Sequence, residues 1–308
     1  FDLATALYST GSAFDSALMS AIESDSVLRN FKMIAEPWDI SRYSLGDFPH
    51  PWREWNDRYR DSVRQFWLGD LARGYGEGVA DIAAGISGSS DVFYYRGPTS
   101  SINFVTAHDG FTLTDLTMYS NKRNEANQEN NRDGSNENRS WNMGVEGPTD
   151  DPDLMALRHS LKKSMMATLL LSAGVPMISM GDEICRTQAG SNNAYSMPRD
   201  MNPGIPDSAE TFMGGWANSW ELNELQRDMR DSVAELTRIR KTYLADVAAE
   251  FFTGRVDLGT QRKDIAWFSL SGREMTDEHW GDGDKRSLTV FIDAGPDRGL
   301  LLLLNSSP

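Results

Sequence analysis

The stretch Ile102-Asn103-Phe104-Val105-Thr106-Ala107-His108-Asp109 is a short apolar run that ends on a histidine and an aspartate. Two other apolar runs also carry a carboxylate, Phe1-Asp2-Leu3-Ala4 and Phe31-Lys32-Met33-Ile34-Ala35-Glu36-Pro37-Trp38. A carboxylate at the end of a buried strand is costly to remove from water, so its presence indicates that the chemistry of a site requires it. The three acids Asp2, Glu36 and Asp109 therefore predict a functional site.

The spacing of the three acids predicts how the strands are arranged. Glu36 follows Asp2 by 34 residues, and Asp109 follows Glu36 by 73 residues. A strand and its following helix take roughly 30 to 40 residues, so these intervals correspond to one unit and then to two. The acids would then follow the first, second and fourth of a series of parallel strands. A barrel gathers such non-adjacent strand ends around one pocket, whereas an open sheet spreads them further apart.

The hydrophobic pattern alternates between strand and helix along most of the chain. We expect strands at residues 31–35, 54–59, 101–107 and 175–180, and helices at residues 12–22, 61–67, 78–84, 153–171 and 223–244. Short strands separated by turn residues then follow at residues 265–270, 287–292 and 300–304. The sequence therefore predicts an α/β domain over residues 1–245 and an incomplete antiparallel β domain over residues 246–308.

The composition limits the possible partners and compartments. A formal net charge of -15 disfavours a nucleic-acid partner, because no local cluster of basic residues offsets it. The most apolar stretch, residues 165–180, is too short to span a bilayer, so no membrane partner is expected. The single cysteine, Cys185, excludes an internal disulfide and favours a reducing, cytoplasmic compartment. The sequence does not predict the oligomeric state.

Paired carboxyl groups are suited to breaking a glycosidic bond. One acts as nucleophile and the other as general acid, and retaining enzymes hold the two about 5 to 5.5 Å apart. A third carboxylate can orient the sugar or stabilise positive charge. The alternative for a single aspartate after a strand is a helix N-cap, a position that aspartate often occupies. Three acids at this spacing favour catalysis over capping.

The motifs around the three acids carry a family resemblance. They are Phe1-Asp2-Leu3-Ala4-Thr5, Ala35-Glu36-Pro37-Trp38-Asp39 and Phe104-Val105-Thr106-Ala107-His108-Asp109-Gly110-Phe111. These resemble three conserved regions of glycoside hydrolase family 13, the α-amylase superfamily. The isoamylase and bacterial glycogen debranching branch is indicated by Glu54-Trp55-Asn56-Asp57-Arg58-Tyr59-Arg60-Asp61, by residues 124–134, and by Gly181-Asp182-Glu183 with Asn192-Asn193-Ala194-Tyr195. The similarity resumes at residues 264–268 and 272–276.

The resemblance implies a role for each acid. Asp2 would be the nucleophile, Glu36 the general acid and base, and Asp109 the stabiliser of the transition state. His108 would hydrogen-bond the sugar in the cleavage subsite. Glu36 must keep its proton near neutral pH, so we expect its surroundings to raise its pKa while Asp2 stays ionised.

The fold that the resemblance implies is a (β/α)8 TIM barrel, of which the chain holds a part. With residues 1–5 counted as a strand remnant, we expect at most five barrel strands, about strands 4 to 8, followed by a partial antiparallel β-sandwich domain. Such a remnant leaves unpaired strand edges and apolar surface. We therefore expect this chain to be a C-terminal fragment of a larger enzyme and to be inactive alone.

Other residues near the predicted strand ends are candidate sugar contacts. Trp38 can stack on a pyranose ring, but packing beside Pro37 explains a tryptophan there equally well. The strand predicted at residues 175–180 is followed by Asp182-Glu183, and possible sugar contacts follow in turn: Arg186, Asn193 and Tyr195. A salt-bridged structural role is the alternative for this region.

Residues 121–142, which we call the Asn-rich loop, contain eight asparagines. This composition predicts a loop, and its position after Asp109 places it on the catalytic face. We expect it to form a wall of the glucan cleft; a solvated surface loop is the alternative. The run Asp133-Gly134-Ser135-Asn136 lacks the alternating ligands of an EF-hand, so no metal or other cofactor is expected.

The leading hypothesis is a retaining glycoside hydrolase that cleaves α-1,6 branch linkages in glycogen or limit dextrin. Its partner would be this branched α-glucan. An α-1,4-acting amylase or transglycosylase would use the same three acids, so it is the first alternative. A non-catalytic glucan-binding or structural fragment is the alternative from another class.

Overall fold

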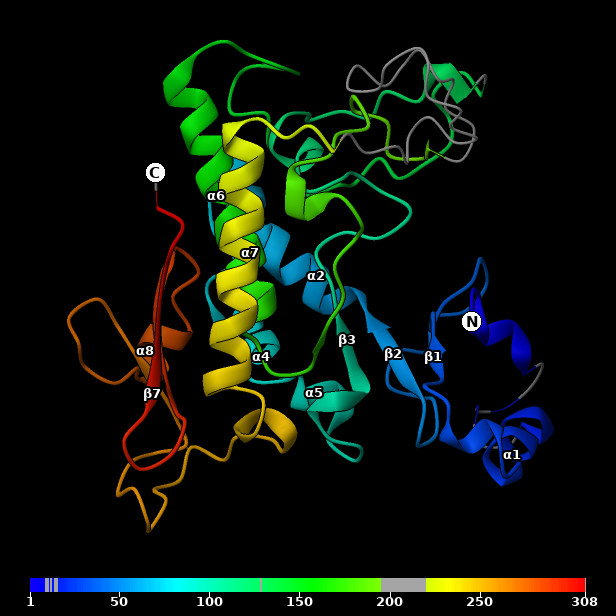
Figure 1. Ribbon diagram of the computed structural model, residues 1–308, viewed down its shortest axis with the longest axis vertical. Coiled ribbons are helices and arrows are strands. Elements are labelled where there is room, and N and C mark those ends of the chain that lie inside the picture. The colour runs from blue at the N-terminus through cyan, green and yellow to red at the C-terminus, as the bar shows by residue number, and fades with distance from the viewer. Residues whose placement is uncertain (9–10, 12, 14–15, 128, 195–219, 308) are drawn as a thin grey trace.

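The computed structural model describes residues 1–307 apart from residues 9–10, 12, 14–15, 128 and 195–219. Four short parallel strands form one sheet in chain order (Figure 1). They are β1 (Ile34–Ala35), β2 (Arg53–Asn56), β3 (Ser101–Asn103) and β4 (Val175–Pro176). In register, Ile34 pairs with Arg53, Glu54 with Ser101, and Ile102 with Val175. The predicted parallel α/β arrangement is confirmed, with each strand shorter than expected.

Residues 1–5 do not form the strand that the sequence predicts. Phe1 N donates to the Ile34 carbonyl (2.8 Å) and Glu36 N donates to the Phe1 carbonyl (2.9 Å), which is the exchange of a parallel pair. The pairing stops there because Leu3 has a left-handed backbone (φ 44°) and a 3-10 helix follows over Ala4–Leu7. Among the described residues the sheet therefore has four strands, within the expected maximum of five, and Phe1 adds one backbone pair beside β1.

The helices connect and flank these strands. The α-helices are α1 (Ala17–Ser24), α2 (Asp57–Arg64), α3 (Asp70–Arg73), α4 (Ala80–Ile86), α5 (Ser90–Phe93), α6 (Pro152–Leu170), α7 (Glu224–Tyr243) and α8 (Asp277–Trp280). A π-helical turn over Gln65–Gly69 joins α2 to α3. Further 3-10 helices lie at Leu28–Asn30, Pro98–Ser100, Asp115–Thr117, Glu125–Asn127, Asp182–Ile184 and Val247–Ala249.

Polar side chains determine where several helices begin. Asn56 ends β2 and caps α2, because its Oδ1 accepts a hydrogen bond from Tyr59 N (2.9 Å). This cap explains why the strand predicted over residues 54–59 stops at Asn56. Asp151 and Asn223 cap α6 and α7 in the same way, so these two long helices begin close to their predicted positions.

The main hydrophobic core lies among α2, α4, α6 and α7. Tyr59 of α2 is 1% exposed, and its hydroxyl donates to the Thr168 carbonyl of α6 (3.1 Å). Trp67 Nε1 donates to the Thr168 hydroxyl (3.0 Å), which links the two segments a second time. A smaller apolar cluster that includes Phe48 and Trp52 supports the N-terminal segment. The end of β1 is therefore fixed by a core of its own.

The C-terminal strands form a separate antiparallel sheet in the order β5-β6-β7. They are β5 (Ile265–Phe268), β6 (Ser287–Asp293) and β7 (Gly299–Asn305). Val290 and Ile292 are fully buried and belong to the main core, whereas Leu303 of β7 is 74% exposed. The antiparallel pairing is as predicted. The described residues contain this one antiparallel sheet, so the second sheet that a sandwich requires is absent from them.

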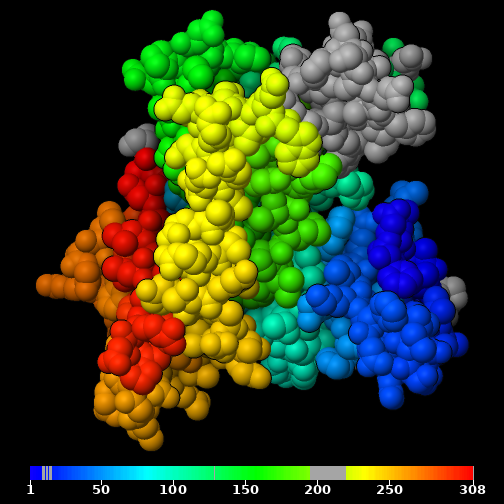
Figure 2. Space-filling view, in the orientation of Figure 1, coloured from blue at the N-terminus to red at the C-terminus, as the bar shows by residue number. Residues whose placement is uncertain are grey.

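The two sheets lie on different sides of the molecule. On the face drawn in Figure 2, the N-terminal residues and the antiparallel strands are on opposite sides, with α7 between them. The N-terminus lies beside β1 in Figure 1. Within the described part of the chain, no helix has both the length and the apolarity needed to cross a membrane.

Candidate active site

Glu36 follows β1 directly and is nearly buried. The residue is 8% exposed, and its neighbours Ala35 and Pro37 are buried as well. Leu3 N donates to Glu36 Oε2 (2.8 Å), so the carboxyl group is oriented toward the N-terminal segment. The strand end therefore holds this acid in a defined position.

Asp2 lies beside Glu36 because the backbone on both sides of it bonds to the end of β1. Phe1 makes the paired bonds described above, and Ala4 N donates to the Glu36 carbonyl (3.0 Å). Asp2 is exposed, and its carboxyl group lies within hydrogen-bonding reach of the Glu36 carboxyl group. The structure thus brings the predicted nucleophile and the predicted acid together.

His108 and Asp109 come from the segment that follows β3. Their side chains are 56% and 67% exposed, and His108 Nδ1 is 4.0 Å from Asp109 Oδ1. The His108 ring centroid lies 5.7 Å from that of Trp55, which supports one side of the imidazole. Asp109 acts electrostatically on Glu36, so the third predicted acid belongs to the same group.

The surroundings raise the pKa of Glu36. Burial is the largest cause, followed by the hydrogen bond with the Asp2 carboxyl group. The negative charges of Asp2 and Asp109 act in the same direction, while the hydrogen bond from Leu3 N opposes them. Glu36 therefore keeps its proton to a higher pH than an exposed glutamate does, which is what a general acid requires.

Asp182 accepts hydrogen bonds from the segment that follows β3, and the sequence did not predict these bonds. It is 2% exposed; Leu113 N donates to its Oδ1 (3.0 Å), and the Thr106 hydroxyl donates to its Oδ2. Burial raises the pKa of Asp182 to about 6, although both hydrogen bonds oppose the shift. Its hydrogen bonds place Asp182 against Thr106 and Leu113, the residues that flank His108 and Asp109 in the chain.

Two arginines of α2 also lie near Asp109 and were not predicted from the sequence. Asp109 favours the charged forms of both Arg60 and Arg64. The two arginines are four residues apart, so they share one face of the helix. The four-residue spacing is the feature of the sequence that indicates a shared face; Arg60 lies within the motif Glu54 to Asp61, and Arg64 follows that motif by three residues.

Trp38 and Arg186 occupy different surroundings. Trp38 is partly buried and pairs through its backbone with Tyr43. Arg186 is 5% exposed; its Nε donates to the Met180 carbonyl (3.0 Å) and its Nη1 to Gln188 Oε1 (2.7 Å). These bonds hold the chain after β4, so they favour the structural alternative for Arg186.

The Asn-rich loop is closed against the residues that follow β4. Asn192 is 1% exposed, and its Nδ2 donates to the Ser135 carbonyl (2.7 Å) and to Asn138 Oδ1 (2.9 Å). Its Oδ1 accepts from Asn124 Nδ2 (2.7 Å), and its carbonyl accepts from Gly110 N (2.8 Å). One asparagine therefore joins the loop to the segment that carries Asp109.

Asn193 also bonds to the Asn-rich loop. Its Nδ2 donates to Asp133 Oδ2 (3.1 Å), which accepts from Asn127 Nδ2 as well (2.8 Å). Among the described residues, no group of three or more His, Cys, Asp or Glu side chains is arranged to hold a metal ion. Tyr195 lies outside the described residues.

Comparison with known proteins finds bacterial relatives whose names refer to glycogen. No protein-family model matches the chain. It is 44% identical over 300 residues to the glycogen operon protein GlgX homolog of Mycobacterium tuberculosis, covering 95% of this chain and 39% of that protein. It is 40% identical over 290 residues to the glycogen debranching enzyme of Pectobacterium carotovorum, covering 92% and 40%. The chain thus spans about two fifths of the length of these curated relatives.

Solved structures with a similar fold include pullulanases. The pullulanase from Bacillus acidopullulyticus gives a TM-score of 0.62 at 17% identity, covering all of this chain and 32% of its own. A pullulanase from Paenibacillus barengoltzii, in complex with maltohexaose and α-cyclodextrin, gives 0.61 at 18% identity, covering all of this chain and 41% of its own. At these identities the likeness concerns the fold alone. The sequence relatives go further: the chain is homologous to bacterial proteins named glycogen operon protein GlgX homolog and glycogen debranching enzyme, and the resemblance predicted from its motifs is confirmed.

Proposed function

We propose that the protein containing this chain is a retaining glycoside hydrolase that cleaves α-1,6 branch linkages of glycogen or limit dextrin. One observation carries the proposal: Glu36 is nearly buried with a raised pKa, directly beside the exposed Asp2 and in the field of Asp109. A protonated acid next to a carboxylate is the arrangement that double displacement at a sugar requires. The names of the sequence relatives support the choice of a branched glucan.

In the proposed reaction, Asp2 attacks the anomeric carbon while Glu36 donates its proton to the glycosidic oxygen. The bond to the leaving chain breaks, and the sugar stays bound to Asp2 as an ester. Glu36 then takes a proton from water, whose oxygen attacks the anomeric carbon and releases Asp2. Asp109 stabilises the positive charge of both transition states, and His108 hydrogen-bonds the sugar.

The same proposal includes the architecture. Residues 1–245 would supply about strands 4 to 8 of a (β/α)8 barrel, with residues 1–3 at the fourth position and β1 to β4 after them. Residues 246–308 would be part of an antiparallel β-sandwich domain. The parallel strands in chain order, with acids after the first, second and fourth positions, support this assignment.

The remaining parts of the proposal concern substrate contacts and location. Trp38, Asn193 and Tyr195 are proposed sugar contacts, and the partner is glycogen or a limit dextrin. A cytoplasmic location is proposed because the chain has a single cysteine, Cys185, and the relatives' names refer to glycogen.

The test uses the full-length protein that contains this chain, with glycogen, β-limit dextrin and unbranched amylose as substrates. We expect release of linear α-1,4 chains from the branched substrates and no cleavage of amylose. Glu36→Gln should abolish turnover because it removes the proton donor, whereas Glu125→Gln, an exposed glutamate of the Asn-rich loop, should leave it unchanged.

Two outcomes would contradict the proposal. Cleavage of amylose into α-1,4 fragments would favour the amylase or transglycosylase alternative. Retention of glucan binding by the full-length protein, with no turnover of any substrate, would favour the non-catalytic alternative.

A further inference from the structure

Arg64 is a buried cation at the last position of α2. The residue is 6% exposed, and burial lowers the pKa of its guanidinium to about 9, so it stays charged at neutral pH. The charges of Asp61 and Asp109 favour the charged form, while Arg60 and Arg139 oppose it. Burying a cation is costly unless its hydrogen bonds are satisfied, so the contacts of this side chain explain its position.

The guanidinium of Arg64 bonds to the start of residues 105–110, which we call the Asp109 segment, and lies near its end. Its Nε donates to the Val105 carbonyl (2.8 Å), where the segment leaves the sheet. Its Nη2 lies beside Gly110, where an added Cβ would be 3.9 Å away. Its Nη1 donates to the Asn138 carbonyl of the Asn-rich loop (3.3 Å). One side chain therefore ties together the helix, the Asp109 segment and the loop.

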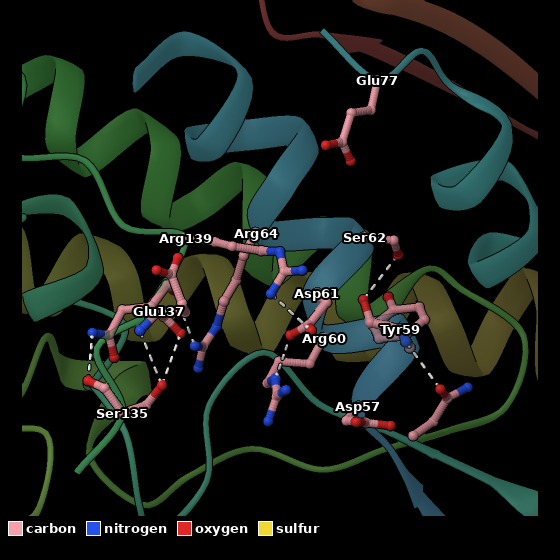
Figure 3. A network of polar contacts seen from close by, with 12 residues as sticks. Asp57, Tyr59, Arg60, Asp61, Ser62, Arg64, Glu77, Ser135, Glu137 and Arg139 are labelled. Atoms are coloured by element: carbon pink, nitrogen blue, oxygen red, sulfur yellow. Dashed lines mark hydrogen bonds and ion pairs between the residues drawn. The ribbon is translucent and has the colours of Figure 1, made fainter. Parts of the chain in front are cut away.

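The neighbouring charges leave Arg64 available for these carbonyls. Asp61 pairs with Arg60 (2.7 Å) and with Arg139 (2.9 Å). Figure 3 shows Arg60 and Arg64 extending from α2 to the same side, away from Ser62. Arg60 lies over the Phe104 ring, with 5.8 Å between its Cζ and the ring centroid, so it supports the strand end next to the Arg64 contact.

We propose that Arg64 is a positioning residue of the hydrolytic site, which sets where His108 and Asp109 stand relative to Glu36. The inference rests on the function proposed above. Arg64 donates to the carbonyl at the start of the segment and to a carbonyl of the Asn-rich loop, whereas the side chains of His108 and Asp109 are exposed. Its planar group donates in two directions at once, which a lysine ammonium on a flexible stem does not reproduce with the same geometry.

The first test measures turnover of β-limit dextrin by the full-length protein. Arg64→Met and Arg64→Lys should each lower kcat by about ten- to a hundred-fold, with KM changed by less than about threefold, because a displaced catalytic group affects the reaction more than binding. The matched control is Arg58→Met. Arg58 lies on the same helix, is 59% exposed and pairs with Asp91 (3.1 Å), so kcat should be unchanged.

The second test does not depend on activity. Amide hydrogen exchange of residues 107–110 should become at least about tenfold faster in both Arg64 variants, while the amides of α6 keep their wild-type rates. If Arg64→Met does not fold, Arg64→Lys carries both tests, because it retains the buried charge and loses the two-way hydrogen bonding.

The outcomes separate this inference from the proposed function. Unchanged exchange at residues 107–110 in a folded Arg64 variant would overturn the positioning role. A wild-type protein without debranching activity would contradict the proposed function, and the exchange measurement would then still decide whether Arg64 fixes the segment. Equal loss of kcat in Arg64→Lys and Arg58→Met would also overturn the inference, since it would show a general effect of changing α2.

Discussion

The Asp109 segment and residues 1–3, which we call the Asp2 segment, bring exposed carboxylates to the same site but are held in different ways. The buried side chains of Arg64 and Asp182 and the backbone carbonyl of Asn192 fix the residues in and around the Asp109 segment. The Asp2 segment is held by backbone hydrogen bonds to β1 and by one bond to the Glu36 carboxyl group. Exposure of a catalytic side chain therefore says little about how firmly its backbone is fixed.

The largest effect should come from removing the asparagine that joins the Asn-rich loop to the Asp109 segment. Asn192→Ala removes hydrogen bonds to the buried side chains of Asn124 and Asn138 and to the Ser135 carbonyl, so we expect a loss of about 3 kcal/mol in the free energy of unfolding. Urea denaturation of the chain measures it. Asn136→Ala, an exposed asparagine of the same loop, should change stability by less than about 0.5 kcal/mol. Equal effects of the two variants would show that the loop is not fixed as described.

A pH-dependent effect should follow from Asp182. Its pKa is raised to about 6 in the folded protein, so its contribution to stability is fully present below its unfolded value and is lost as pH rises through about 6. Asp182→Asn removes this loss. The stability of the variant relative to the wild type should therefore increase between pH 4 and pH 7, by on the order of 2 kcal/mol. If the difference in stability between the variant and the wild type stays constant from pH 4 to pH 7, the pKa of Asp182 is not raised as described.

The contribution of Glu36 to stability should also decrease as the pH rises. Because burial and the Asp2 carboxyl group raise its pKa, its contribution to stability is lost as pH rises through the folded value. Glu36→Gln should therefore stabilise the chain at neutral pH and have less effect in acid, although it abolishes the proposed reaction. Urea denaturation at pH 4 and at pH 7.5 measures both; destabilisation at the higher pH would show that the ionised carboxylate is a net stabilising group.

The smallest change in stability should come from the Asp2 segment. Asp2→Asn alters an exposed side chain, so the free energy of unfolding should change by less than about 0.5 kcal/mol. The variant should still lower the pKa of Glu36, because it removes a negative charge and a carboxyl partner. An NMR titration of isotope-labelled glutamate measures the shift. An unchanged pKa would show that Asp2 does not contribute to the raised pKa of Glu36.

The sequence predicted the elements of the two sheets better than their ends. Patterns of apolar residues located the seven strands found in the described part of the chain, because buried positions recur with the period of the element. The strand expected over residues 54–59 ended early because Asn56 caps a helix, and residues 1–5 failed to form a strand because Leu3 turns the backbone to positive φ. Both limits depend on local backbone geometry, which periodicity does not report.

The site was predictable where an acid follows a strand and less so where a side chain acts from a distance. Asp2, Glu36 and Asp109 could be grouped because parallel strands deliver their carboxyl ends to one edge. Arg64 and Asp182 bond to backbone groups in and beside the Asp109 segment. The spacing of residues in the sequence does not predict such contacts. Cationic and acidic side chains are also common on solvated helix faces, so their burial became evident only from the packing.

The hydrogen bond from Tyr59 to Thr168 joins residues that are 109 positions apart and encloses the whole Asp109 segment in one loop of chain. Closing so long a loop has a large entropic cost that is recovered only when α2 and α6 pack together. We therefore expect the segment that carries Asp109 to become fixed when α2 and α6 pack together. Assembly of the site would then depend on contacts between residues that are far apart in the sequence and distinct from the three acids.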